Sequence, residues 1–122
     1  MILVDTSIWV DHLRSGVPQL TAALQGGDVL IHPWVVGELA CGNLRDRSRV
    51  LQLLQSLPSA CVATPAEVLT LIDQHQLMGR GIGFVDAQLL ASARLSTCFL
   101  WTQDRLLAGL AEALGVNSAW SA

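Results

Sequence analysis

Short apolar runs alternate with longer segments of helical periodicity along this chain of 122 residues. Apolar runs bounded by turn or capping residues predict buried strands; they cover residues 2–4, 29–31, 61–63 and 98–102. Segments with helical spacing predict helices, which cover residues 8–14, 18–24, 33–44, 46–57, 65–78, 84–95 and a last helix from Asp104 to a point before Gly115. Residues 116–120 are expected to add an edge strand.

Local signals support several helix boundaries. Thr64 is followed by Pro65 and, three residues after Thr64, by Glu67, which is the pattern of a capping box with proline at the first helical position. Thr6 and Ser7 are expected to cap the helix over residues 8–14. Residues 79–83 contain three glycines and predict a loop.

The alternation of strands and helices predicts an α/β fold, in which a mainly parallel sheet of four or five strands is covered by helices on both faces. The length suits one domain spanning residues 1–122. Although 52% of the residues are hydrophobic, no apolar run approaches the roughly 20 residues that span a bilayer. The carboxylate at Asp5 and the absence of a basic start argue against a signal peptide. We therefore expect a cytoplasmic protein.

The net charge of −3 neither excludes nor supports a nucleic-acid partner. Four of the ten acids are assigned below to one site, and the rest of the chain then has a balance of +1. All seven basic residues are Arg, whose guanidinium group binds phosphate through paired hydrogen bonds.

Two acids follow predicted strands. Asp5 comes directly after the first strand, and Asp104 comes two residues after the strand that ends at Thr102. The carboxyl ends of parallel strands meet at one edge of the sheet, which is where binding sites form in such folds. We expect Asp5 and Asp104 to lie close together at that edge.

Glu38 and Asp86 are each a single acid among apolar residues of a predicted helix. An isolated carboxylate in an apolar setting costs several kcal/mol unless it is paired or binds a metal. Clustered carboxylates suit Mg²⁺ or Mn²⁺, and such ions promote phosphodiester cleavage. Asp5, Glu38, Asp86 and Asp104 are therefore the predicted metal-binding catalytic residues, although helix capping, the helix dipole or exposure to solvent could also account for each acid alone.

Other polar residues are assigned supporting roles. The hydroxyl groups of Thr6, Ser7 and Thr102 are expected to order a carboxylate or a water, with helix capping as the alternative. Arg80, in the glycine-rich loop, is a predicted phosphate contact of the substrate.

The acids stand in motifs that resemble those of PIN-domain nucleases. The motifs are DTSIW at residues 5–9, VGEL at 36–39, GFVDAQLLA at 83–91 and WTQDRL at 101–106. The order and the residues of these motifs are most similar to those of the VapC toxins of bacterial toxin–antitoxin modules, and the resemblance covers essentially the whole chain.

The resemblance implies a three-layer α/β/α PIN-like fold and an endoribonuclease that depends on Mg²⁺ or Mn²⁺ and arrests translation by cutting RNA. It also implies a homodimer that a VapB-type antitoxin holds inactive through an apolar groove leading to the acids. The four acidic positions of the family correspond to Asp5, Glu38, Asp86 and Asp104, and its hydroxyl positions to Thr6 or Ser7 and Thr102.

Other α/β proteins with acids at strand ends fit the sequence less well. A phosphoacceptor receiver domain needs a lysine, and this chain has none. A haloacid-dehalogenase-type phosphatase needs a second acid two residues after its nucleophilic aspartate, whereas Ser7 follows Asp5 at that distance. Two alternatives stay open: a PIN-fold module that binds RNA or protein without catalysis, and a PIN nuclease outside a toxin–antitoxin pair.

Overall fold

The computed structural model describes residues 1–117. The elements of that part are, in chain order, β1 (Ile2–Val4), α1 (Thr6–Ser15), α2 (Pro18–Gln25), β2 (Val29–Leu30), α3 (Pro33–Ala40), α4 (Arg47–Gln55), α5 (Pro65–His75), α6 (Phe84–Leu95), β3 (Phe99–Trp101) and α7 (Arg105–Ala113). The capping box at Thr64 and Glu67 is present at the start of α5 as predicted.

The three strands form a parallel sheet in the order β2-β1-β3. Leu3 in the central strand pairs with Leu30 on one side and Leu100 on the other. Single parallel bridges extend the sheet at both edges, between Ile31 and Ser59 and between Leu100 and Asn117. The predicted α/β class with a parallel sheet is confirmed, while the number of full strands among the described residues is three rather than four or five.

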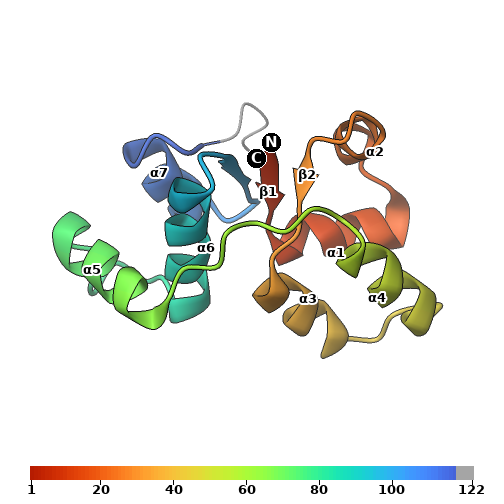
Figure 1. Cartoon of the computed structure of the whole chain (residues 1–122), viewed down its shortest axis with the longest axis horizontal. Coiled ribbons are helices and arrows are strands. Elements are labelled where there is room, and N and C mark those ends of the chain that lie inside the picture. Colours follow the sequence, from red (N-terminus) through yellow and green to blue (C-terminus); the bar gives the residue numbers. More distant parts are fainter. Residues whose placement is uncertain (118–122) are drawn as a thin grey trace.

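Helices cover the sheet from two sides. Figure 1 shows α1, α2 and α4 to the right of β1 and β2 with α3 below these strands, and α5, α6 and α7 gathered to the left. Side chains of the strands are buried between these groups, as the absence of exposure at Leu3 and Val4 and the 2% exposure of Leu100 show. A continuous apolar core on both faces explains why the strands read as unbroken apolar runs. Among the described residues, no helix is both long and apolar enough to cross a membrane.

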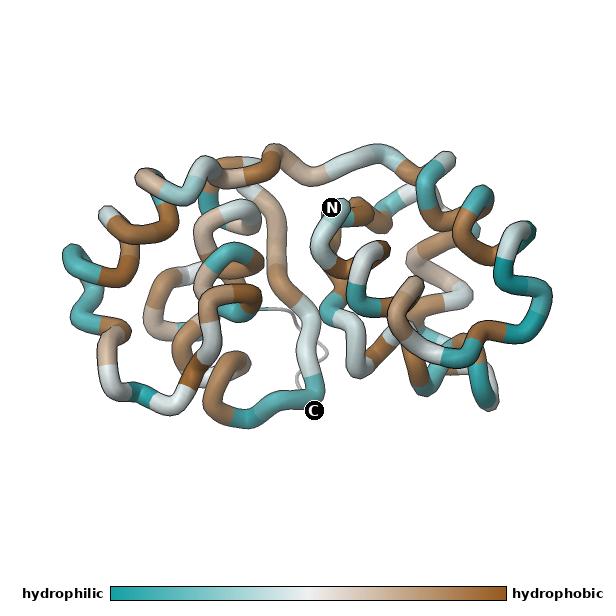
Figure 2. The backbone as a smooth tube through the Cα atoms, turned by 90° about the horizontal axis from the view of Figure 1, so that it is seen from below, coloured by the Kyte–Doolittle hydropathy of each residue, from teal (hydrophilic) through white to brown (hydrophobic). Residues whose placement is uncertain are grey.

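The strand predicted over residues 61–63 is wrong. This segment belongs to the connection that crosses from α4 to α5, from one helix group to the other (Figures 1 and 2). Its backbone bonds to side chains of α6 and of its C-cap Ser96 rather than to a strand. Ala63 N donates to Gln88 Oε1 (3.1 Å), Gln88 Nε2 donates to Ala63 O (2.9 Å), and Cys61 N donates to Ser96 Oγ (2.8 Å). Side chains thus provide the hydrogen-bond partners that the backbone N–H and C=O groups of this segment need, and no pairing with a strand is required.

Several other boundaries differ from the prediction, among them the end of α5, which lies at His75 and not at residue 78. The helix predicted over residues 33–44 ends at Ala40, where the Arg47 guanidinium donates to the carbonyl oxygens of Ala40 and Gly42. The first helix begins at Thr6 and is capped by Asp5, so the predicted caps Thr6 and Ser7 lie inside it. The predicted edge strand over residues 116–120 is represented by the bridge at Asn117, and residues 118–120 lie outside the described part of the chain.

Candidate active site

Asp5 is held between the ends of β1 and β3. It follows β1 directly, and its backbone N–H donates to Trp101 O at the end of β3 (2.9 Å). Its Oδ1 accepts from Thr6 N (2.7 Å), and its Oδ2 accepts from Thr102 Oγ1 (2.7 Å). The residue is only 9% exposed. Both carboxylate oxygens are thus fixed in a largely buried position.

Asp104 lies next to Asp5 through a shared partner. Thr102 Oγ1, which donates to Asp5, accepts a hydrogen bond from Asp104 N (3.1 Å). Asp104 caps α7, where its Oδ1 accepts from the backbone N–H groups of Leu106 (2.9 Å) and Leu107 (3.2 Å). The expectation that Asp5 and Asp104 meet at the carboxyl edge of the sheet agrees with this arrangement.

Glu38 reaches the same region from α3. Its Oε1 accepts from Thr6 Oγ1 (2.7 Å), and Thr6 is the residue after Asp5. The side chain of Glu38 is exposed, unlike that of Asp5. Its carboxylate is therefore tethered to the start of α1 and remains open to solvent.

Asp86 stands in the first turn of α6, where its Oδ2 accepts from Gly83 N (3.4 Å). Burial is the largest influence on its pKa and raises it, the hydrogen bond from Gly83 lowers it, and the negative charges of Asp5, Asp104 and Glu38 raise it further. The net pKa is raised. Each of the other three acids therefore lies near enough to repel the Asp86 carboxylate.

The pKa of Asp5 is also influenced by neighbouring acids. Burial raises its pKa most strongly, the hydrogen bonds from Thr102 and Thr6 lower it, and the charges of Glu38 and Asp104 raise it, so that the net pKa lies above its ordinary value. The four predicted acids thus come from the junction of β1 and α1, from α3, from α6 and from the cap of α7, and they share one electrostatic site. Four oxygen-donating carboxylates that repel one another favour the binding of cations.

The donor set fits a hard divalent cation, whose preferred ligands are carboxylate oxygens. Within residues 1–117, however, no group of three or more His, Cys, Asp or Glu side chains is arranged so that it could hold a metal ion. Two of the acids are engaged elsewhere, Glu38 with Thr6 and Asp104 with the start of α7. A cation would therefore have to draw the carboxylates together.

The three predicted hydroxyl residues behave differently. Thr6 and Thr102 donate to Glu38 and Asp5, so each orders a carboxylate. Ser7 Oγ is buried and has no hydrogen-bond partner among the described residues. Arg80 is exposed, and its neighbour Gly81 packs beside Leu106 of α7, close in sequence to Asp104.

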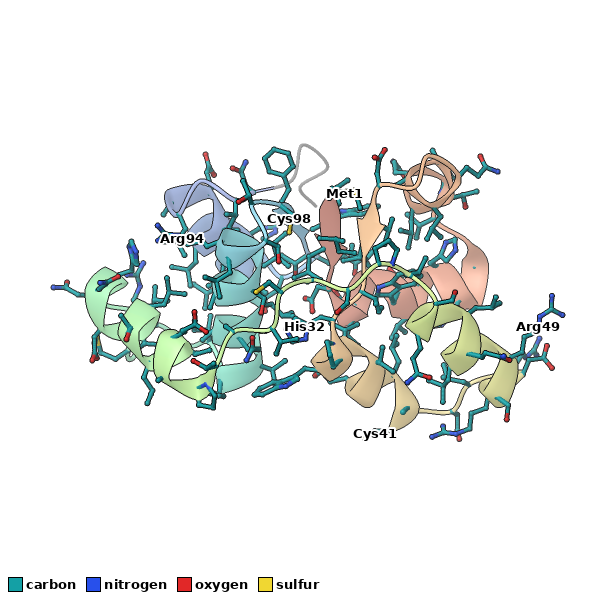
Figure 3. The ribbon with its side chains drawn as sticks, viewed as in Figure 1. Met1, His32, Cys41, Arg49, Arg94 and Cys98 are labelled. Carbon is teal, nitrogen blue, oxygen red and sulfur yellow. The ribbon has the colours of Figure 1, made fainter. Side chains whose placement is uncertain are left out.

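A buried polar network that joins the start of α3 to α6 was not identified from the sequence. His32 Nε2 lies 3.0 Å from Ser92 Oγ and 3.3 Å from Gln88 Oε1, and Ser92 Oγ donates to Gln88 Oε1 (2.6 Å). Figure 3 shows His32 between the two helix groups. The signal was present as two polar residues one helical turn apart, Gln88 and Ser92, on an otherwise apolar face of α6.

Comparisons with known proteins agree with this architecture. The family model of the PIN domain matches residues 2–113. Two relatives, both called Ribonuclease VapC32 and belonging to Mycobacterium tuberculosis strains CDC 1551 / Oshkosh and ATCC 25618 / H37Rv, are 46% identical over 120 residues, which cover 98% of this chain and 97% of theirs.

Solved structures share the fold at lower identity. A toxin–antitoxin complex from Klebsiella pneumoniae superposes with a TM-score of 0.72 at 22% identity, covering 100% of both chains. FitAcB from Neisseria gonorrhoeae gives a TM-score of 0.66 at 22% identity, covering 92% of this chain and 94% of the other. PAE2754 from Pyrobaculum aerophilum gives 0.59 at 22% identity, covering 88% and 77%.

Proposed function

The chain belongs to the PIN-domain family, and from that membership we propose that it is a divalent-metal-dependent endoribonuclease and the toxin of a type II toxin–antitoxin pair. The observation that carries the proposal is the shared electrostatic site of Asp5, Glu38, Asp86 and Asp104 at the carboxyl edge of the sheet. The name of the relatives that are 46% identical, Ribonuclease VapC32, supports RNA as the substrate.

Asp5, Asp86 and Asp104 are the proposed ligands of Mg²⁺ or Mn²⁺, with Glu38 as a ligand directly or through water. When bound, such an ion supplies a Lewis acid that activates water and stabilises the oxygen leaving phosphorus. Thr102 and the backbone of Thr6 hold the Asp5 carboxylate in place, and Thr6 Oγ1 does the same for Glu38. With their carboxylates held in this way, Asp5 and Glu38 would be positioned to hold the ion without a further loss of side-chain freedom.

The proposed partners follow from the same membership. A VapB-type antitoxin would cover apolar side chains beside the acids, where Phe84 is 42% and Leu106 is 41% exposed. A large exposed apolar surface is a feature of interaction sites. We further propose that residues 1–122 form one domain, that the protein is a homodimer and that it is cytoplasmic. Light scattering of the purified protein tests whether it is a dimer.

RNA cleavage by the purified protein tests the function. The assay compares total RNA incubated with Mg²⁺ or Mn²⁺ with the same reaction in EDTA, and compares the native chain with Asp5→Asn and Asp86→Asn. Metal-dependent cutting that both variants lose supports the proposal. Cutting by folded Asp5→Asn at the native rate would overturn the assignment of Asp5. No cutting with either metal, together with RNA binding, would favour a binding module.

A further inference from the structure

Asp86 differs from the other three acids in having no hydrogen bond to another part of the site. Thr6 and Thr102 link the other three acids to one another. Among residues 1–117, the only hydrogen bond of the Asp86 side chain is the one from Gly83, which is the N-cap of the same helix. The place of Asp86 relative to the other carboxylates therefore depends on the contacts that fix helix α6.

Helix α6 and the helix that carries Glu38 pack on different neighbours. Helix α6 packs on α5 and β3, whereas α3 packs on α1 and α4. Contacts between the two helices lie near their starts and include the rings of Trp34 and Phe84, whose centroids are 5.8 Å apart. They also include the contact of His32, the cap of α3, with the side chain of Ser92 in α6.

The contact of His32 belongs to a chain of directional hydrogen bonds. Because Nδ1 of His32 accepts from Trp34 N, Nε2 carries the proton and donates to Ser92 Oγ (3.0 Å). Ser92 Oγ donates in turn to Gln88 Oε1 (2.6 Å), and the Gln88 amide bonds to both backbone groups of Ala63. His32, Ser92 and Gln88 are at most 1% exposed, so water cannot replace a partner that is lost.

Hydrogen bonds restrict the relative placement of two helices more narrowly than apolar contacts do, because they weaken steeply when donor and acceptor move out of line. A magnesium site needs such restriction, since the ion demands near-ideal octahedral geometry with oxygen ligands at about 2.0–2.1 Å. A shift of α6 against α3 would carry Asp86 with it, because Asp86 stands only two residues before Gln88.

We propose that the network of His32, Ser92 and Gln88 positions Asp86 on α6 relative to Glu38 on α3 for the binding of the divalent cation. The inference rests on the proposed function and adds positioning residues to it. All three side chains of the network are buried, so they act through the placement of the two helices and make no contact with the ion.

Binding of Mn²⁺ in the absence of RNA tests the positioning role. Electron paramagnetic resonance measures free Mn²⁺ during titration of the metal-free full chain and gives the dissociation constant. The test variant is Ser92→Ala, which removes the central hydroxyl and keeps a good helix former in α6. Its matched control is Ala23→Gly, a buried change inside α2, which carries none of the four acids. Both variants should lower the melting temperature by a few degrees.

We expect Ser92→Ala to weaken Mn²⁺ binding about tenfold or more, as is typical for groups that orient metal ligands, while Ala23→Gly leaves the dissociation constant unchanged. The same substitutions in an Asp86→Asn background separate positioning from general destabilisation. Once Asp86 no longer offers a carboxylate, Ser92→Ala should have little further effect on the dissociation constant, because the group that it positions is gone.

Two results would overturn the inference. One is an equal dissociation constant for Ser92→Ala and Ala23→Gly, and the other is an equal loss from Ser92→Ala in the native and the Asp86→Asn backgrounds. Either result would show that the network only stabilises the fold. If Ser92→Ala does not fold, His32→Asn takes its place, because asparagine keeps a cap for α3 and lacks the imidazole that reaches Ser92.

The failure of this inference is distinguishable from that of the proposed function. If Asp86→Asn weakens Mn²⁺ binding by the native chain, the proposed metal site stands whatever the effect of Ser92→Ala. If the native chain binds Mn²⁺ no more tightly than Asp86→Asn does, the proposed metal site fails and the positioning role fails with it. If Ser92→Ala shows the expected loss and the native chain cuts no RNA, catalysis is overturned and the positioning role stands.

Discussion

His32 Nε2 lies 3.0 Å from Ser92 Oγ, although 60 residues separate the two in the chain. The Nδ1 atom of the same ring accepts from Trp34 N (3.0 Å) and so caps α3. Because Nδ1 accepts, the proton of the neutral ring must be on Nε2, which donates toward Ser92 and Gln88. One side chain thus joins α3, which carries Glu38, to α6, which carries Asp86.

We expect His32→Ala to lower the free energy of unfolding by about 3 kcal/mol, because it removes a helix cap, opens a cavity and leaves Gln88 and Ser92 with fewer buried partners. Urea unfolding measures the change. His75→Ala provides the control, since His75 is exposed, and it should change stability by no more than about 0.5 kcal/mol. Equal effects of the two substitutions would contradict the role of His32.

Stability should depend on pH through His32. Burial lowers its pKa below the ordinary value of 6.5, and the hydrogen bond to Gln88 opposes this only in part. The unfolded chain therefore takes up a proton at a pH where the folded chain does not. The contribution of neutral His32 to the free energy of unfolding is complete above pH 6.5 and is lost as the pH falls. The free energy of unfolding then decreases by at most about 1.4 kcal/mol per pH unit.

Urea unfolding between pH 5 and pH 8 measures this dependence. His32→Asn keeps a capping side chain that does not titrate, so its stability should vary less over this range than that of the native chain. Identical pH profiles for native and His32→Asn protein would exclude His32 as the source.

Asp5→Asn should abolish RNA cleavage and raise the melting temperature of the metal-free protein. Cleavage should fall by about 10³-fold or more, as for the loss of a catalytic group. Burial and the charges of Glu38 and Asp104 raise the pKa of Asp5, so its ionised form is unfavourable in the folded chain. Asparagine keeps the capping oxygen without the charge.

Differential scanning calorimetry with and without Mg²⁺ provides the measurement. The ion should raise the melting temperature of the native chain, since a ligand of the folded state stabilises it, and it should raise that of Asp5→Asn less. A lower melting temperature for Asp5→Asn in EDTA would show that the charge of Asp5 stabilises the fold.

Thr102→Val should impair the site through Asp5. Valine has nearly the shape of threonine but lacks the hydroxyl that donates to Asp5 Oδ2 and accepts from Asp104 N. Its loss should weaken Mg²⁺ activation by about 10- to 100-fold, the range for residues that orient a metal ligand. Thr102→Ser keeps the hydroxyl and should retain most of the activity. Comparable losses in both variants would point to packing instead of the hydrogen bond.

Gly81→Ala should lower stability by about 1–2 kcal/mol. Gly81 has a φ of +86°, and an added Cβ would lie 3.1 Å from Leu106 Cδ2. Gly37→Ala is a matched control of opposite sign, because Gly37 lies inside α3 with open space at its Cβ, and alanine favours a helix. Thermal unfolding distinguishes them, and a neutral Gly81→Ala would show that the loop relaxes freely.

Local patterns in the sequence were sufficient for most of the fold. The helix over Phe84–Leu95 was predicted with its observed bounds, and the start of the helix at Pro65 followed from its capping box. These signals depend on residues within one or two helical turns of each other, so they can be recognised without knowledge of the tertiary structure. Residues 61–63 were assigned wrongly because an apolar triplet does not reveal which partner its backbone will bond to, and here the partner is Gln88.

The sequence by itself determined which acids follow strands or interrupt apolar helix faces. The reason is that buried positions form apolar runs in strands and recur with helical spacing in helices, so an acid that ends or interrupts such a pattern is visible in the sequence. Only the tertiary structure decided which groups meet: Thr102 with Asp5 across 97 residues, Thr6 with Glu38 across 32 residues, and His32 with Ser92. The physical reason is that a hydrogen bond between distant segments depends on the packing of whole elements, which residue spacing along one helix or strand does not encode.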